Sequence, residues 1–286
     1  MKTIKKTLLA VSCIIVTCSL LALPLLLRQE TEPAPTPSPT PTPAPRDLQP
    51  VIANAISFFE ESEEPDDPYA LLLLDVVRRR FGMAEFADAL TRYDEIMAMF
   101  PDQAPLMRLF RRIADHGNTL QYQDLLEVSE DLDLLTLPAL YCDQLDSPPD
   151  YQSMLEQATH IGDYMLTHAL LACIWIQENG CKMPVPDDFF ENVYNANAAL
   201  INDDSVVEDL ELEAATFLCL AGQGALVDPV FVDRVVAAQN YDGGWLFSSD
   251  TAGASNWHPS VLALLLLLHM EHPADSYPPM LAPESP

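Results

Sequence analysis

The chain has 286 residues, of which 43 are aspartate or glutamate and 14 are lysine or arginine, and its formal net charge is −29 at pH 7. Such an acidic surface repels nucleic acid and anionic lipid head groups, so neither is expected as a partner of the main domain. Only nine glycines occur, and apolar residues recur at helical spacing rather than in the alternation typical of strands. The composition therefore predicts an all-α protein without a nucleic-acid partner.

An apolar run near the N-terminus predicts a membrane partner. Lysines precede residues 7–27, which carry no charge and, as a helix, are about 30 Å long, enough to cross a bilayer's hydrocarbon core. Because lysines favour the cytoplasmic side, the rest of the chain is predicted to be extracellular. We predict that residues 1–28 form an uncleaved signal anchor of a single-pass protein, since no clear cleavage site precedes Arg28. The alternatives are a cleaved signal peptide, which gives a secreted protein, and a lipoprotein acylated at Cys13 or Cys18.

Three further segments follow the predicted anchor. Residues 29–46 are rich in proline and threonine, with proline at alternate positions, which predicts a semi-rigid polyproline II linker. Residues 47–272 are predicted to form a helical repeat domain, and the proline-rich residues 273–286 are predicted to be a disordered tail.

Apolar periodicity and proline–acid signals divide the domain into helices. The predicted helices are 48–62, 68–81, 84–99, 104–116, 120–130, 132–145, 150–161, 164–179, 187–202, 208–222, 229–239 and 257–271.

The later helices repeat at a fixed interval. Segments 164–176, 209–221 and 254–266 align without a gap at a step of 45 residues, and each has a polar start followed by apolar residues on all sides. A helix that is apolar all round is buried among other helices. Paired helices at this period predict a closed α/α toroid, with an open α-solenoid as the alternative.

One loop carries a family resemblance. The motif Gln-Asn-Tyr-Asp-Gly-Gly-Trp at 239–245, followed by the apolar run 261–265, resembles the repeat of α/α-toroid proteins such as terpene cyclases and protein prenyltransferases. The resemblance implies that the glutamine caps the next helix and that an aromatic ring stacks upon it. The cyclases' Asp-rich protonating motif and the prenyltransferases' Asp-x-Cys zinc pair are both absent, so the resemblance implies the fold without those two chemistries.

A second resemblance concerns the order of a few residues. Thr167-His168, Gly180-Cys181, Glu213 and His258 are similar in order to an uncharacterised family of secreted animal proteins. This resemblance implies no particular activity.

The 45-residue step predicts one shared site. It places His168, Glu213 and His258 at equivalent positions of three successive inner helices, which would converge at one end of a ring's cavity. Two imidazoles and a carboxylate could bind a divalent metal or act as general acid and base. The structural alternative is that these side chains lie near helix starts and satisfy free backbone amides there.

Four more residues are predicted to line the same mouth and bind a ligand. Tyr164 and Trp257 offer aromatic faces, and Asp242 and Trp245 lie on the loop before the third inner helix. The turn at 242–245 is equally explained by its two glycines, which favour positive φ.

Four cysteines lie outside the predicted anchor, and sequence alone allows three pairings. Cys142 and Cys181 lie near predicted loops, whereas Cys173 and Cys219 lie inside apolar helices. We predict a disulfide between Cys142 and Cys181, because export permits disulfides.

Two functions remain from the sequence, beside a purely structural envelope role. The first is a membrane-tethered binding module for an unknown extracellular ligand or protein. The second is a metal-dependent or acid/base enzyme that acts on a polyprenyl or carbohydrate substrate. The absence of a nucleophile elbow, a His-Glu-x-x-His motif or a phosphate-binding glycine loop favours the binding module.

Overall fold

A computed structural model describes most of the chain after the proline-rich linker. The described residues are 47–61, 67–100, 105–120, 128–183, 185–186, 188–202, 204–274 and 276–284. They belong to the compact unit Arg46–Pro286. The predicted anchor, 1–28, and linker, 29–46, lie outside these ranges. Within the ranges, no helix combines the length and the apolar character needed to span a bilayer.

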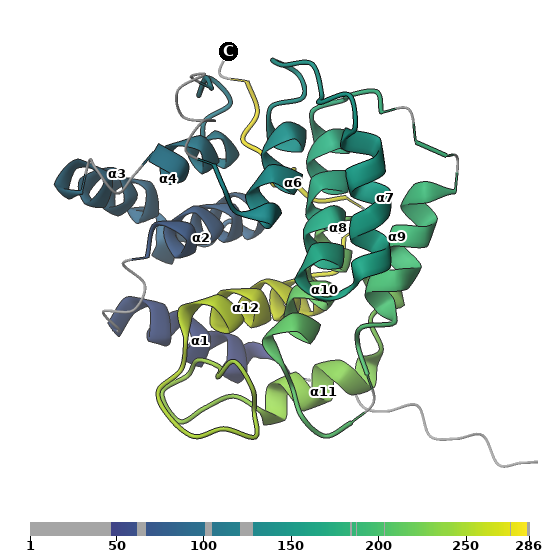
Figure 1. The fold of residues 1–286 in the computed structure, drawn as a ribbon. Helices are drawn as coiled ribbons and strands as arrows, with labels where there is room; N and C mark the ends of the chain where they lie inside the picture. Colours follow the sequence, from purple (N-terminus) through teal and green to yellow (C-terminus); the bar gives the residue numbers. More distant parts are fainter. Residues whose placement is uncertain are drawn as a thin grey trace, which may run out of the picture. The chain divides into compact units, whose positions relative to one another are not determined.

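The named elements of the described residues are all helices, which confirms the all-α prediction (Figure 1). Two isolated antiparallel bridges, Glu208–Ser248 and Trp245–Asn256, accompany them. The helices are α1 (Gln49–Glu61), α2 (Pro68–Phe81), η2 (Ala84–Phe86), α3 (Ala89–Met99), α4 (Pro105–Phe110), η4 (Arg111–Ile113), α6 (Asp131–Leu140), α7 (Tyr151–Ile161), α8 (Asp163–Glu178), α9 (Phe189–Ala198), α10 (Asp209–Leu220), η5 (Gly224–Leu226), α11 (Pro229–Ala237) and α12 (Trp257–Glu271).

Proline–acid signals set two helix starts as predicted. At α2, the Asp67 carboxylate accepts a hydrogen bond from the backbone N–H of Tyr69 (2.8 Å), and proline occupies the first helical position. At α11, Asp228 accepts from the N–H of Val230 (2.8 Å) in the same way. Proline is favourable there because the first helical N–H has no partner within the helix.

Three helices that are apolar on all sides form the interior. Helix α10 packs against α8 and α12, and α12 also packs against α2. More amphipathic helices cover them: α7 packs on α6 and α8, α9 on α8 and α10, and α1 on α12 (Figure 1). Along α12, Val261 to Leu268 are at most 1% exposed, and each buried leucine contributes about 1.5–3 kcal/mol.

Part of the C-terminal segment, which was predicted to be disordered, is packed against the helices at residues 280–282. Met280 is 1% exposed, and the Glu178 carboxylate accepts hydrogen bonds from the N–H groups of Met280 (2.8 Å) and Leu281 (2.9 Å). The N–H of Ala282 donates to the carbonyl of Ile113 (2.8 Å). The prediction of disorder was wrong for these residues because acceptors far away in the sequence satisfy their backbone amides.

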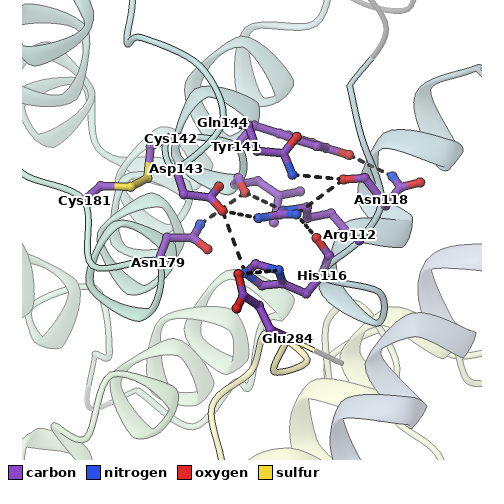
Figure 2. Close-up of polar contacts among 12 residues, drawn as sticks. Arg112, His116, Asn118, Tyr141, Cys142, Asp143, Gln144, Asn179, Cys181 and Glu284 are labelled. Atoms are coloured by element: carbon purple, nitrogen blue, oxygen red, sulfur yellow. Dashed lines mark hydrogen bonds and ion pairs between the residues drawn. A yellow bond between two sulfur atoms is a disulfide. The ribbon is translucent and has the colours of Figure 1, made fainter. Parts of the chain in front are cut away.

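A buried arginine fixes the loop after α6, as Figure 2 shows. Arg112 is 1% exposed, donates to the Asp143 carboxylate at 2.5 Å, and also donates to the carbonyls of His116 and Asn118. Beside this network Cys142 forms a disulfide with Cys181, the pairing favoured from the sequence.

The two remaining cysteines of the described residues are buried and free. Cys173 and Cys219 lie in α8 and α10, and burial raises the pKa of each thiol to about 12. Both therefore stay protonated and pack as small apolar side chains.

The disulfide is expected to stabilise the fold measurably. It closes a loop with a sequence separation of 39, so the double variant Cys142→Ser/Cys181→Ser should lose about 4 kcal/mol of unfolding free energy in a urea titration. An unchanged midpoint and slope would show that the loop is held without the covalent link.

Candidate functional site

A cavity of about 350 Å³ lies among the interior helices. Its walls come from α2, α4, η4, α6, α8, α10, α12 and the C-terminal segment. The apolar part of the wall includes Leu72, Leu171, Trp175, Phe217, Leu262 and Met280. The polar part includes Tyr69, Glu130, Asp133, His168, Glu213 and His258.

Polar and apolar lining residues are separated by one helical turn. Glu213 and Phe217 lie four residues apart on α10, as His258 and Leu262 do on α12. Side chains at this spacing share one helix face and differ in depth. The first two turns of these helices therefore carry the polar mouth, and the turn that follows each polar residue carries the apolar interior.

The three residues predicted from the repeat meet at this mouth. Glu213 is 1% exposed and accepts a hydrogen bond from the Thr167 hydroxyl. Its Oε1 lies 3.2 Å from His168 Nδ1, and its Oε2 lies 3.5 Å from His258 Nε2. Burial alone would raise the pKa of Glu213. The hydrogen bond from His168 and the charges of both histidines lower this pKa by more than burial raises it, so the net pKa lies below the ordinary value. Glu213 is therefore a buried carboxylate held in its charged form.

His258 lies between two carboxylates. Its Nδ1 is 2.7 Å from Asp209 Oδ1, and the other Asp209 oxygen accepts from the Tyr164 hydroxyl (2.8 Å). Burial lowers the pKa of His258, but the hydrogen bond and charge of Asp209 and the charge of Glu213 raise it more, and the net pKa is raised. Since both ring nitrogens face acceptors, the ring is bound as an imidazolium.

His168 presents a different arrangement. Its Nδ1 faces two acceptors, Glu213 Oε1 and the carbonyl oxygen of Tyr164 (2.9 Å). Since both neighbours of Nδ1 are acceptors, this ring nitrogen carries a proton and donates it toward them.

The starts of α10 and α12 are capped by residues other than Glu213 and His258, and the start of α8 has no side-chain cap. Asn256 accepts from the N–H of His258 (2.9 Å) at α12. At α10, Glu211 accepts from the N–H of Glu208 (3.1 Å). Glu213 contacts both His168 and His258, and His258 also contacts Asp209.

One group in the described residues could hold a metal ion. Ligand atoms of Asp209, Glu213 and His258 all lie within 4.8 Å of one another. Asp209 takes the place that the sequence prediction gave to His168. A metal ligand must be deprotonated, whereas both carboxylates favour the proton on His258, so a metal would compete with that proton.

Three predicted ligand-binding residues, Asp242, Trp245 and Tyr164, do not line the cavity. Asp242 accepts from the N–H and hydroxyl of Ser255 (3.1 and 2.5 Å), and burial of its carboxylate is outweighed by these bonds, so its pKa is lowered. Trp245 is 1% exposed and donates from Nε1 to the carbonyl of Val235 (2.8 Å). Their placement at the mouth was wrong, because each fastens its own loop. Trp257 lines the cavity as predicted, whereas Tyr164 lies outside the cavity wall and donates its hydroxyl hydrogen bond to Asp209.

The loop of the family resemblance docks on α1. Gly243 has φ +91, and a Cβ there would lie 2.3 Å from the carbonyl oxygen of Asn54. Gln239 donates to the carbonyls of Val51 (2.8 Å) and Gly243 (2.9 Å). The glutamine therefore holds α1, while Asn256 caps the following helix.

Several residues that line the cavity or contact its mouth were missed from the sequence. Asp209 lies 45 residues after Tyr164, and Phe217 lies 45 residues before Leu262. The 45-residue step could therefore have identified both Asp209 and Phe217. Asp133 and Tyr69 lie in the first half of the domain, where no such step is readable.

Comparisons with protein-family models, curated proteins and solved structures found no match. The resemblance to the α/α-toroid repeat therefore stays a prediction. Any assignment of function depends on the geometry of the cavity and its mouth.

The imidazolium predicts a pH-dependent stability. The folded pKa of His258 lies above 6.5, so its contribution is complete below pH 6.5 and is lost as pH rises through the folded pKa. The folded pKa of Glu213 lies below 4.5, so its contribution is lost only as pH falls through that lower value. His258→Asn should therefore cost about 2 kcal/mol at pH 5.5 and progressively less at alkaline pH, as measured by urea unfolding.

His160→Asn, at an exposed position of α7, is the matched control. A His258→Asn cost that grows from pH 5.5 to pH 9 would contradict the bridging imidazolium.

Proposed function

We propose that the domain is an α/α toroid that binds a small amphipathic ligand in its central cavity. The order of helix contacts supports a closed ring over an open solenoid. Helices α6, α8, α10 and α12 pack in succession, α12 packs on α2, and α2 packs on α4. Arg112, which follows α4, donates to the carbonyl of Leu140 in α6 (3.4 Å). This hydrogen bond links the α4 end of the series to α6.

The observation that carries the proposed function is the two-part cavity wall. An apolar interior favours the body of a ligand through area burial, and a polar mouth favours a head group. A purely structural helical array has no need of a cavity with a charged rim at one end.

The charges at the mouth favour a cationic head group. Asp133 lines the cavity and makes no hydrogen bond or ion pair with the described residues. Burial raises its pKa, which the charge of His168 partly offsets, so an added cation would stabilise its charged form. Glu130 lies nearby in the wall, and the aromatic faces of Tyr69 and Trp257 attract cations.

The N-terminal sequence supports a location for this module outside a membrane. The lysines before residues 7–27 favour an anchor with its C-terminal side extracellular, with secretion as the alternative. The proline-rich residues 29–46 would hold the domain away from the bilayer.

A second candidate function is acid/base or metal-dependent catalysis on a polyprenyl or carbohydrate substrate. The arrangement that favours it is His258 between Asp209 and Glu213, because an imidazolium held by carboxylates can donate a proton. The same three residues would be the ligands of a metal.

Three probes with one alkyl chain test the binding function. Octyltrimethylammonium should bind the purified full-length chain at least about tenfold more tightly than octanol, and octyl sulfate should bind most weakly, in titration calorimetry. Asp133→Asn should remove most of the preference for the cation. Glu191→Gln, an equal charge change at an exposed position of α9, should leave it unchanged.

The outcomes separate the two parts of the proposal. Equal binding of all three probes would contradict the head-group preference and leave the apolar cavity as the binding site. If none of the probes binds, the binding function itself is wrong.

Metal removal separates the two candidate functions. Binding of octyltrimethylammonium should be unchanged by a chelator, because the His258 ring holds protons where a metal would bind. One metal ion per purified chain, lost in Asp209→Asn, would favour the metal-dependent enzyme instead.

A further inference from the structure

The C-terminal segment, residues 276–284, is held in place by charged side chains of two helices. Arg79 in α2 donates to the carbonyl oxygen of Met280 (2.7 Å), and Glu178 in α8 accepts from the N–H groups of Met280 and Leu281. Charge-assisted hydrogen bonds of this kind are about twice as strong as neutral ones. The backbone at Met280 is thus bound on both its carbonyl and its amide side.

A second arginine fixes the start of the segment. Arg80 donates to the carbonyl of Pro278 (2.7 Å) and lies over the ring of Tyr277, 4.8 Å from its centroid. Its Nε donates to His269 Nε2 (2.9 Å), and His269 Nδ1 bonds the carbonyl of Leu265 (2.7 Å). Burial lowers the pKa of His269 to about 4, so the neutral ring accepts from the arginine.

The segment lies between two cavities. Met280 lines the 350 Å³ cavity, whose polar mouth is at the first turns of the interior helices. Pro279 and Tyr277 line a separate cavity of about 610 Å³. That cavity is bordered by residues at the helix C-termini, among them Glu178 and His269.

The depth of the first cavity follows from its helices. His168 at the mouth and Trp175 in the apolar wall are seven residues apart on α8, which corresponds to about 10 Å along the helix. Met280, from a different part of the chain, adds an unbranched and adaptable side chain to the apolar wall.

We propose that the C-terminal segment is the floor of the ligand cavity and that Met280 limits the length of the ligand's apolar body. This inference rests on the proposed binding function. It assigns a specificity role to a segment that also divides the interior into two cavities. Shortening Met280 removes side-chain atoms from the floor, whereas a bulkier residue raises it.

A homologous series of n-alkyltrimethylammonium probes tests this role in the full-length chain. Each methylene buried should increase affinity about fourfold until the chain reaches the floor, after which affinity should stop rising. Met280→Ala should move this limit to longer chains, and Met280→Phe should move it to shorter ones. Met270→Ala, which removes equivalent atoms from the wall of the other cavity, should leave the limit in place.

Opposite shifts of the chain-length limit in the two Met280 variants would support the role of Met280 as the floor of the cavity. An unchanged limit in both variants, with the wild-type chain binding the series, would overturn the inference and leave the binding function intact. If the wild-type chain binds no member of the series, the binding function fails first. If Met280→Ala does not fold, the other two variants still test the inference. The chain-length limit should be shorter in Met280→Phe and unchanged in Met270→Ala.

Discussion

The constraint on which this structure depends is the burial of helices that have no polar face. Helices α8, α10 and α12 bury apolar residues on all sides along most of their length, and they are stable only when other helices surround them. This requirement explains the covering layer of α7, α9 and α1. It also places the polar residues of the cavity mouth, His168, Glu213 and His258, within the first two turns of the three interior helices.

Burying Glu213 among these helices has a cost that its neighbours must offset. An unpaired carboxylate in an apolar interior would be neutralised or would destabilise the fold. Here Thr167, His168 and His258 surround it, and Asp209 balances the charge on His258. The result is a charged, hydrogen-bonded group at the rim of an apolar hollow. This combination of rigidity and local charge suits recognition of a small ligand, and it resembles the arrangement that acid/base catalysts need.

Sequence periodicity predicted the features that depend on local sequence patterns. It failed for features that depend on contacts with residues far away in the sequence. The bounds of α2 and the meeting of His168, Glu213 and His258 followed from helix signals and from a 45-residue step. Asp133 escaped prediction because its helix lies outside the readable repeat. The order of the segment around Met280 escaped because it depends on Glu178, far away in the sequence. Asp242 was misplaced because a turn motif does not reveal which neighbour its carboxylate will bind.

The central claim is that one set of helices forms both a charged rim and an apolar hollow behind it. X-ray crystallography of the purified protein under xenon pressure tests this directly, because xenon enters apolar cavities and avoids polar ones. We expect a xenon atom among Trp175, Phe217 and Leu262. Xenon only in the cavity beside Arg80, or a string of ordered waters among those three side chains, would contradict it.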